Sequence, residues 1–239
     1  AKQLGKKEDY KRFSKRAISY RKLFDKQFNL LRPRNDDGSW LATYNPESGA
    51  NFEKNLGFIE GNAWQYTFMV THDVKGLMKL IGGPKPFAQR LQDVFDKNQF
   101  DMANEPDIAY PYLFNYVKGE EYRTQKMVRD LSAKHFKNSP DGIPGNDDTG
   151  TMSAWAVFSM MGIYPVNPTA AAYTITKPMF DRIVLHLDAD YYNGKTVEIT
   201  TKKSDGEQAI KKITIDGKRH KGYFIKHNDF VKASSISIE

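Results

Sequence analysis

The sequence predicts a mainly α-helical protein that ends in a β segment. Over the first 170 residues apolar side chains recur in steps of three and four, as with Phe87, Leu91 and Val94, which is the spacing of one helix face. From about residue 173 the spacing changes to steps of two, and Asn-Gly or Asp-Gly pairs separate the short apolar runs, as in β-hairpins. We therefore expect a helical part at 1–170 and a β segment at 171–239.

The helical part divides at glycines and prolines. The expected helices lie at 8–31, 63–82, 86–96, 107–118, 120–137 and 151–161. Gly82 and Gly83 supply a left-handed cap for the second helix, and Pro84 cannot continue it; Gly162 caps the last helix in the same way. Helices paired through short loops favour an antiparallel helical array or a helical toroid.

The β segment contains six short runs with strand spacing. In order they are "YTIT", "IVLHL", "TVEIT", "AIKKITIDG", "GYFI" and "SISIE". Each is only a few residues long and is bounded by turn-forming residues, so short antiparallel strands joined by tight turns are expected.

Composition narrows the classes of function. The 239 residues include no cysteine, which excludes disulfides, thiolate nucleophiles and zinc–thiolate sites. No apolar run approaches the ~18 residues of a membrane span. The formal net charge is +7, but the lysines are scattered and interrupted by acids, which is typical of solvated faces and argues against a nucleic-acid partner. Aromatic residues make up 13%, which fits either a ring-lined groove or dense helix packing.

Acid-bearing loops precede three of the predicted helices. The first loop holds Glu60, with Asn62 and Trp64 directly after it and the His72–Asp73 pair further along. One interpretation makes Asn62 a helix cap, Glu60 an acid favoured by the helix dipole, and Trp64 a core residue. A lone histidine on an apolar helix is likewise more often a core residue than a catalyst. The other interpretation makes Glu60 a functional carboxylic acid.

The second loop holds Asn104 and Glu105 directly before Pro106, which suits the first position of a helix. Amide and carboxylate oxygens are hard donors of the kind that calcium takes. Two such donors do not make a metal site by themselves, so a helix cap is the alternative.

The third loop lies within "SPDGIPGNDDTGTMSAW", residues 139–155, and contains the adjacent Asp147 and Asp148. Two carboxylates in one turn repel each other, so their proximity implies a cation, backbone donors or a role as a base. In a helical toroid the three loops meet at one end and surround a pocket with carboxylates and aromatic rings. Cleavage of a glycosidic bond requires such groups, an acid to protonate the leaving oxygen and a base to activate water.

Three long segments carry a family resemblance. They are "EGNAWQYTFMVTHDVKGL", "FDMANEPDIAYPYLFNY" and "DGIPGNDDTGTMSAWAVFSMMGIYPVNP". These segments resemble glycoside hydrolase family 92, the calcium-dependent exo-acting α-mannosidases that are abundant in gut Bacteroidetes. The resemblance extends from about residue 8 to residue 200, and a chance match over motifs of this length and order is very improbable.

The resemblance implies a fold and an activity. It implies that 1–170 is the latter part of an (α/α)6 catalytic barrel, followed at 171–239 by short antiparallel strands. It implies hydrolysis of α-mannosides with inversion of the anomeric centre, most often at α-1,2 linkages of high-mannose N-glycans. It further implies a calcium ion that binds two hydroxyls of mannose and helps to distort the ring.

The family motifs also imply residue roles. Glu60 matches the general acid, and the base and its helper match Asp147 and Asp148, in an order that the sequence leaves open. Asn104 and Glu105 match the calcium-binding segment. Sugar-binding or supporting roles are implied for four further residues: Asn62, Trp64, His72 and Asp73.

The chain is short for this family. We expect it to lack the family's N-terminal β-sandwich domain and the first barrel helices, and we expect the full-length protein to be periplasmic, at the cell surface or secreted. The alternative is a non-catalytic fragment or a carbohydrate-binding module derived from such an enzyme. Linkage preference stays open, because it depends on subsite residues that the motifs do not identify.

Overall fold

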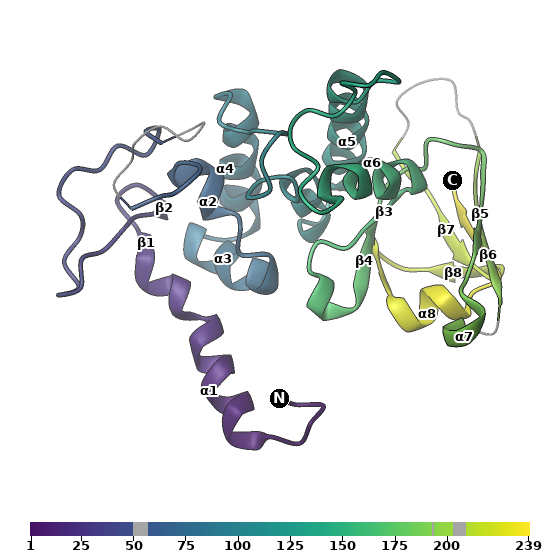
Figure 1. The fold of residues 1–239 in the computed structure, drawn as a ribbon, viewed down its shortest axis with the longest axis horizontal. Coiled ribbons are helices and arrows are strands. Elements are labelled where there is room, and N and C mark those ends of the chain that lie inside the picture. The colour runs from purple at the N-terminus through teal and green to yellow at the C-terminus, as the bar shows by residue number, and fades with distance from the viewer. Residues whose placement is uncertain (50–56, 193, 203–208) are drawn as a thin grey trace. The chain divides into compact units, whose positions relative to one another are not determined.

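The computed structural model describes residues 1–49, 57–192, 194–202 and 209–239 (Figure 1). The chain forms two compact units, Ala1–Asp101 and Met102–Glu239. Helices predominate early in the chain and strands follow α6, which agrees with the predicted order of a helical part and a β segment. The predicted domain division at residue 170 stays a prediction.

The described part of the first unit combines helices, one short hairpin and an irregular stretch at 32–49. Its elements are α1 (Lys7–Ala17), a 3₁₀ helix (Ser19–Leu23), β1 (Phe24–Asp25), β2 (Leu30–Leu31), α2 (Ala63–Thr67), a 3₁₀ helix (Thr71–Asp73), α3 (Val74–Ile81) and α4 (Pro84–Asp96). Its core is built from apolar side chains of α2, α3 and α4, among them Trp64, Leu77, Phe87 and Leu91.

The helix predicted at 8–31 is wrong beyond Ala17. α1 ends there, and β1 and β2 then pair antiparallel, with Phe24 opposite Leu31. The apolar residues in this stretch kept a helical spacing, but the turn at Asn29, with φ of 57°, directs the chain back on itself. The buried side chains therefore belong to a hairpin, and α1 has no buried residue at all.

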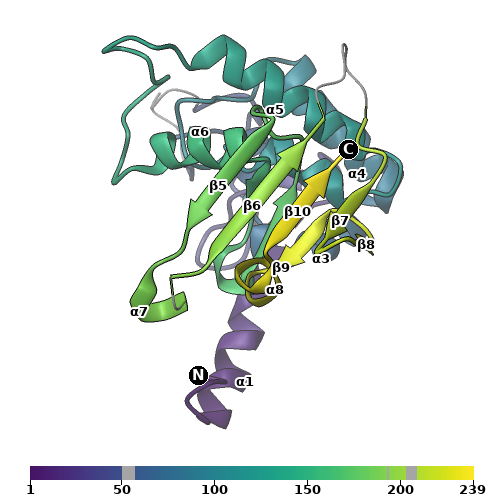
Figure 2. The same cartoon turned by 90° about the vertical axis from the view of Figure 1, so that its right-hand side faces the viewer.

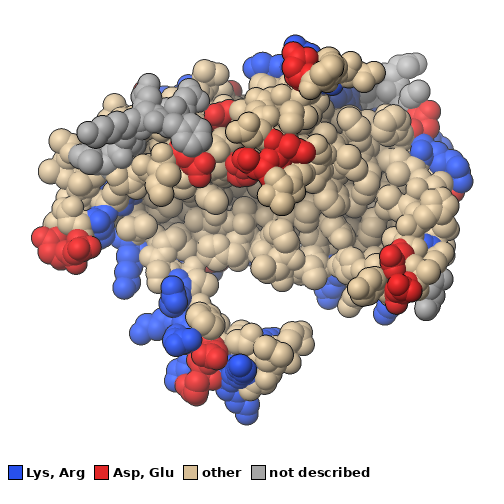
Figure 3. Space-filling view, viewed as in Figure 1, with Lys and Arg blue, Asp and Glu red and all other residues tan. Residues whose placement is uncertain are grey.

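α1 carries charges of both signs on its exposed surface. Figure 3 shows Lys and Arg interspersed with Asp and Glu along this helix, at the bottom of the view. Arg12 forms an ion pair with Asp9 at 3.1 Å. Mixed charge of this kind is typical of a solvated helix face and not of a phosphate-binding surface.

The single helix predicted at 63–82 is instead three shorter elements. Asp73 begins α3 as its N-cap, because its Oδ1 accepts a hydrogen bond of 3.0 Å from the Gly76 N–H. It does not lie in the middle of a helix. The predicted end is confirmed, since Gly82 has φ of 113° and α4 begins at Pro84.

The second unit contains the longer part of the chain. Its helices are a 3₁₀ helix (Tyr110–Tyr116), α5 (Glu121–His135), α6 (Thr151–Met161), a 3₁₀ helix (Pro168–Ala170), α7 (Ala189–Tyr192) and α8 (His227–Lys232). Its strands are β3 (Ile163–Tyr164), β4 (Ala172–Ile175), β5 (Arg182–His186), β6 (Thr196–Thr201), β7 (Ile213–Ile215), β8 (Lys218–His220), β9 (Phe224–Lys226) and β10 (Ser235–Ile238).

Two of the predicted helices of this unit are confirmed and one is not. α5 lies within its predicted range, and α6 spans 151–161 as predicted and ends at Gly162, which has φ of 77°. The helix predicted at 107–118 is a 3₁₀ helix that begins only at Tyr110, so Pro106 precedes it instead of opening it.

The strands form two sheets, one of five strands in the order β5-β6-β10-β7-β8 (Figure 2) and one of three in the order β3-β4-β9. The predicted Asp-Gly turn joins β7 to β8, with φ of 47° at Asp216 and 75° at Gly217, as a type I′ hairpin turn requires. One pair departs from the antiparallel expectation: β6 and β10 are parallel. The intervening chain is long enough for the crossover that a parallel pair needs.

Alternation along the five-stranded sheet produces its buried face. Val197 and Ile199 of β6 are buried with Ile236 and Ile238 of β10, while the residues between them are more exposed. In the described part of the chain, no helix combines the length and the apolar character that a membrane crossing requires.

Candidate active site

Glu60 lies in the loop that leads into α2, and its side chain is half-buried. The Tyr66 phenol hydrogen-bonds to its carboxylate. Burial, and next the negative charge of Glu60, raise the pKa of Tyr66, so this hydroxyl remains a donor at neutral pH. Tyr66 belongs to the same motif as Glu60, but no pattern in the sequence marks it as a partner of that acid.

Asn62 is fully buried and acts as the helix cap that one interpretation of the sequence expected. Its Oδ1 accepts from the Gln65 N–H at 3.1 Å, and Gln65 Oε1 accepts from the Asn62 N–H at 2.9 Å, which completes a capping box. The Asn62 amide also donates to Gln99 Oε1 at 2.7 Å. The side chain thus holds the start of α2, and its predicted sugar contact stays a prediction.

Trp64 lies in the core of the first unit with 4% of its surface exposed. The Arg90 guanidinium stands over its ring at 4.9 Å from the ring centre, which is a cation–π distance. This packing fixes the ring directly after the loop that carries Glu60.

His72 contacts the last residue of α1, and Asp73 contacts the 3₁₀ helix that follows it. The Nε2–H of His72 donates to the Ala17 carbonyl at 2.8 Å. Asp73 Oδ2 accepts from the Tyr20 hydroxyl at 2.8 Å and from the Arg21 guanidinium at 2.7 Å. These contacts fasten α1 and the 3₁₀ helix after it to the start of α3. The predicted roles of the pair towards a sugar stay predictions.

The Asp73 carboxylate should make the first unit sensitive to acid. Burial alone would raise the pKa of Asp73, but the hydrogen bonds from Arg21, Tyr20 and the Gly76 N–H hold it below its ordinary value. A carboxyl with a depressed folded pKa stabilises the fold fully above its unfolded pKa of about 3.9, and this stabilisation is lost as pH falls through the folded pKa. We expect Asp73→Asn to lower the free energy of unfolding in urea by about 1–2 kcal/mol at pH 7. The difference from the parent chain should shrink below about pH 4.

Asp130→Asn is the matched control for this prediction. Asp130 pairs with Lys126 across one turn of α5, and both side chains are 55% exposed, so the pair contributes little. Equal destabilisation by the two substitutions, or a difference for Asp73→Asn that does not depend on pH, would contradict the role given to Asp73.

The second predicted loop, residues 103–106, belongs to the second unit. Asn104 has 7% of its surface exposed, and its Oδ1 accepts from the Glu105 N–H at 3.1 Å. Asp107, which the sequence analysis did not single out, is fully buried. An ionised carboxylate is removed from water only where partners or a cation offset the loss of hydration. Three oxygen-bearing side chains therefore lie within one short stretch.

These side chains suit calcium in chemical type but not in number. Calcium takes six to eight oxygen ligands, and Asn104 with Glu105 can provide only a few of them. Across the described residues, no group of three or more His, Asp or Glu side chains is arranged to hold a metal ion. The predicted calcium ligands Asn104 and Glu105 stay a prediction.

The two adjacent aspartates of the third loop have different surroundings. Asp147 Oδ1 accepts from the Ser153 N–H at 2.8 Å and its Oδ2 from the Ser153 hydroxyl at 2.9 Å, so this carboxylate holds the first turn of α6. Asp148 is exposed, and no residue in the described ranges donates a hydrogen bond to its carboxylate. The structure thus distinguishes two side chains that the sequence left equivalent.

The backbone at these aspartates is strained. Asp148, Thr149 and Gly150 have φ of 40°, 63° and 88°, three consecutive residues in the left-handed region. This conformation costs about 1–2 kcal/mol for each non-glycine residue, although Asp tolerates it better than most. Strain of this kind persists only where the surrounding structure enforces it, and it gathers at functional sites. The turn separates Asp148 from the helix that engages Asp147.

The third loop lies directly against the second. A Cβ atom added at Gly145 would stand 2.7 Å from the Ala103 carbonyl oxygen, so only glycine permits this approach. Trp155 Nε1–H of α6 donates to the Ile108 carbonyl at 2.8 Å and holds the same two segments together. Two of the three predicted loops are therefore neighbours within the second unit. The predicted pairing of Glu60 with the aspartates stays a prediction.

Comparison with known proteins identifies the class. The family model for the glycosyl hydrolase family 92 catalytic domain matches residues 1–239, the whole of the chain. The chain belongs to glycosyl hydrolase family 92.

Solved structures show the same relationship. The whole chain matches a family GH92 α-mannosidase from Bacteroides thetaiotaomicron, solved in complex with mannoimidazole, with a TM-score of 0.87 and 29% identity, and covers 33% of that protein. It matches a family GH92 inverting mannosidase from Bacteroides thetaiotaomicron VPI-5482 with a TM-score of 0.86 and 25% identity, and covers 34% of it. The chain thus spans about a third of the length of these relatives.

A curated relative comes from Arthroderma benhamiae and is described as an uncharacterized secreted glycosidase. It is 30% identical over 182 residues, which are 75% of this chain and 23% of that protein.

Proposed function

We propose that this chain is the latter part of an (α/α)6 catalytic domain of an exo-acting α-mannosidase that inverts the anomeric centre. The observation that supports this most is the match of the entire chain to solved α-mannosidases with TM-scores of 0.85 to 0.87. Its motif-bearing loops add the carboxylates that glycosidic cleavage requires. Further barrel helices and a β-sandwich domain are its proposed partners in the full-length protein.

Glu60 is the proposed general acid. It donates its proton to the oxygen of the departing sugar as the glycosidic bond breaks. The Tyr66 hydroxyl, which hydrogen-bonds to the Glu60 carboxylate, is a positioning residue in this proposal. Trp64, fixed under Arg90, holds the start of the helix that follows Glu60.

Asp148 is the proposed base and Asp147 its positioning neighbour. A base must accept a proton from water, so its carboxylate has to be accessible and not consumed by structural hydrogen bonds. Asp148 meets both conditions, whereas both oxygens of Asp147 are used by Ser153. An inverting enzyme leaves room for water, and we therefore expect about 6.5–9.5 Å between the carboxyls of Glu60 and Asp148.

The proposed substrate is a mannose-terminated oligosaccharide, with the α-1,2 linkages of high-mannose N-glycans as the first candidates. The proposed cofactor is calcium, with Asn104 and Glu105 as two of its ligands. When bound, calcium would hold two neighbouring hydroxyls of the mannose ring and favour its distortion. An extracytoplasmic location is proposed for the full-length protein, because the fungal relative is described as secreted.

Calcium removal provides the experiment for this function. We expect the full-length protein to release mannose from an α-1,2-mannobiose and to lose most of this activity on exhaustive chelation, with recovery on adding calcium. We expect the isolated chain to bind calcium weakly or not at all, because two or three oxygen donors fall short of six to eight. Full activity after chelation would contradict the cofactor, and no release of mannose from any α-mannoside would contradict the function.

A second candidate function rests on the length of the chain. Because it spans about a third of its solved relatives, residues 1–239 by themselves would be a non-catalytic fragment or a carbohydrate-binding module. Calorimetry of the isolated chain with the same mannobiose distinguishes this candidate: saturable binding without hydrolysis supports it, and turnover by the isolated chain rejects it.

A further inference from the structure

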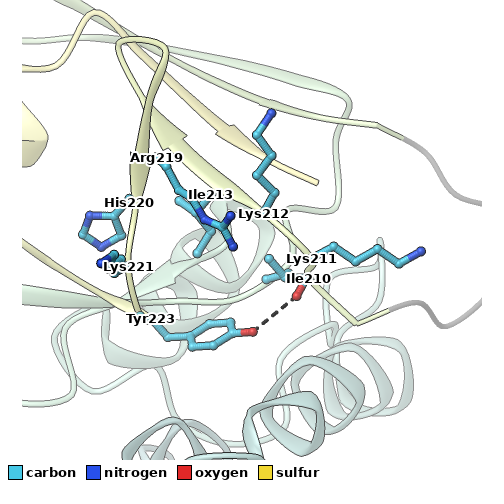
Figure 4. Close-up of a pocket in the computed structure, with 9 residues that line it drawn as sticks. Ile210, Lys211, Lys212, Ile213, Arg219, His220, Lys221 and Tyr223 are labelled. Atoms are coloured by element: carbon cyan, nitrogen blue, oxygen red, sulfur yellow. Dashed lines mark hydrogen bonds between the residues drawn. The ribbon is translucent and has the colours of Figure 1, made fainter.

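A cationic pocket opens at the end of the β7–β8 hairpin in the second unit. Beyond the last pair of the ladder, Ile213 opposite His220, the two arms of the hairpin separate and enclose a cavity of about 200 Å³ (Figure 4). Of the lining residues, Lys211 and Lys212 come from one arm and Arg219 and Lys221 from the other. Among the residues that the structure describes, no Asp or Glu lines it.

Three of these cations have no carboxylate partner in the described part of the chain. Lys212, Arg219 and Lys221 form no ion pair with any residue that the structure describes. Two acids lie near the pocket without pairing with these cations: Glu239, whose Oε1 accepts from the Ser237 hydroxyl at 3.3 Å, and Glu121, whose charge acts on Tyr223. Like charges that outnumber their counter-charges raise the local potential, and an anion relieves this repulsion.

Both arms of the hairpin are held in place. The Lys212 N–H donates to the Glu239 carbonyl at 3.0 Å, which ties one arm to β10. The Ile210 N–H donates to Gln125 Oε1 of α5 at 2.9 Å, and the Tyr223 hydroxyl donates to the Ile210 carbonyl at 3.3 Å (Figure 4). The opening is therefore defined by hydrogen bonds of the hairpin backbone to Glu239, Gln125 and Tyr223 and does not depend on the long cationic side chains.

Tyr223 and His220 shape the neutral walls of the pocket beside the cations. Burial, and next the negative charge of Glu121, raise the pKa of Tyr223, so the hydroxyl keeps its proton at neutral pH. The His220 Nε2–H donates to the Phe224 carbonyl at 2.9 Å, which fixes the ring at the mouth of the hairpin. Because Tyr223 donates its only proton to Ile210 and His220 donates its Nε2–H to Phe224, the donors left for a ligand are those of the cationic side chains.

We propose that this pocket binds a phosphate or sulfate group, either free or carried by a sugar. The cavity is smaller than the ~300 Å³ at which pockets for whole small molecules begin, so it suits a single anionic group. The Arg219 guanidinium can give two parallel hydrogen bonds to such an oxyanion, and the lysines add point charges. The proposal does not depend on the mannosidase function, and its test needs no catalysis.

Calorimetric titration of the full-length protein with inorganic phosphate at constant ionic strength tests the site. We expect saturable binding to one site, weakened roughly tenfold or more by the double substitution Arg219→Gln with Lys221→Gln, because each removes a charge-assisted donor. The control is Lys218→Gln with Lys226→Gln, which removes the same charge from exposed positions that do not line the pocket. It should change the affinity by less than about twofold.

The source of the anion follows from parallel titrations with inorganic sulfate, a hexose 6-phosphate and a hexose 6-sulfate. Tighter binding of the sugar esters supports a glycan-borne group, and equal affinity supports the free ion. Absence of saturable binding by the parent chain would overturn the proposal. So would equal weakening by the two double substitutions, because that result reports only the overall charge. All four substituted side chains are exposed, and circular dichroism verifies that both variants are folded.

Discussion

Replacing Glu60 by Gln in the full-length protein should reduce turnover of an α-mannobiose by about 10²–10⁴-fold, the contribution of a positioned general acid. Glutamine has nearly the same shape and can still bond to Tyr66, but it has no proton to give to the departing sugar. An aryl mannoside with an acidic phenol as leaving group needs little protonation and should be affected far less. The measurement is kcat/KM for both substrates with the parent and the variant.

Glu47→Gln is the matched control, since Glu47 is an exposed acid of the same unit, and it should leave both substrates unaffected. Equal losses on the two substrates by Glu60→Gln would argue against the acid. Tyr66→Phe removes the phenol that hydrogen-bonds to Glu60, and we expect a smaller loss because the proton donor itself remains.

Local chemistry predicted several elements well. α6 ends at Gly162 and α3 at Gly82 because glycine enters the left-handed region without a steric penalty, a property of the residue that does not depend on its neighbours. The β7–β8 turn at Asp216–Gly217 is predictable for the same reason. Where the chain needs a special backbone conformation and the sequence offers a residue suited to it, prediction succeeds.

The spacing of apolar residues predicted the structure less reliably where a helix and a hairpin can bury residues at the same positions. Apolar residues after Ala17 recur as in a helix, yet Phe24 and Leu31 are partners across a hairpin. Their side chains are buried in either arrangement, so burial does not distinguish the two. The parallel pairing of β6 with β10 is also absent from local patterns, because it joins strands separated by β7, β8, β9 and α8.

The candidate site shows the same limit. The motifs identified the acid-bearing loops, and the cap formed by Asn62 follows from its place before Gln65. The close approach of Gly145 to Ala103 could not be predicted, because a contact between distant segments leaves no periodic pattern in the sequence. The left-handed run from Asp148 to Gly150 could not be predicted either, since threonine rarely adopts the left-handed conformation that Thr149 has here.

The left-handed run from Asp148 to Gly150 separates the surroundings of the two aspartates, so we expect activity and stability to respond differently to their substitution. We expect Asp148→Asn to reduce turnover of both the mannobiose and the activated aryl mannoside in the full-length protein by about 10²–10⁴-fold. Both substrates are affected because water must be deprotonated whatever the leaving group. The stability of this variant should hardly change, since no described residue bonds to this carboxylate and Asn tolerates the left-handed region.

Asp147→Asn is the matched comparison, with the same change of charge one residue away. It should lower the free energy of unfolding by about 1 kcal/mol, because an amide can accept only one of the two hydrogen bonds that Ser153 gives to the carboxylate. Its activity should fall less than that of Asp148→Asn, through displacement of the loop and not through loss of the base. The two measurements are kcat/KM on both substrates and the urea midpoint. If Asp147→Asn removed all activity at unchanged stability while Asp148→Asn remained active, the two roles would be exchanged.

Substitution of the base also differs from Glu60→Gln in its effect on the activated substrate. An acid variant spares turnover of the activated aryl mannoside, and a base variant does not.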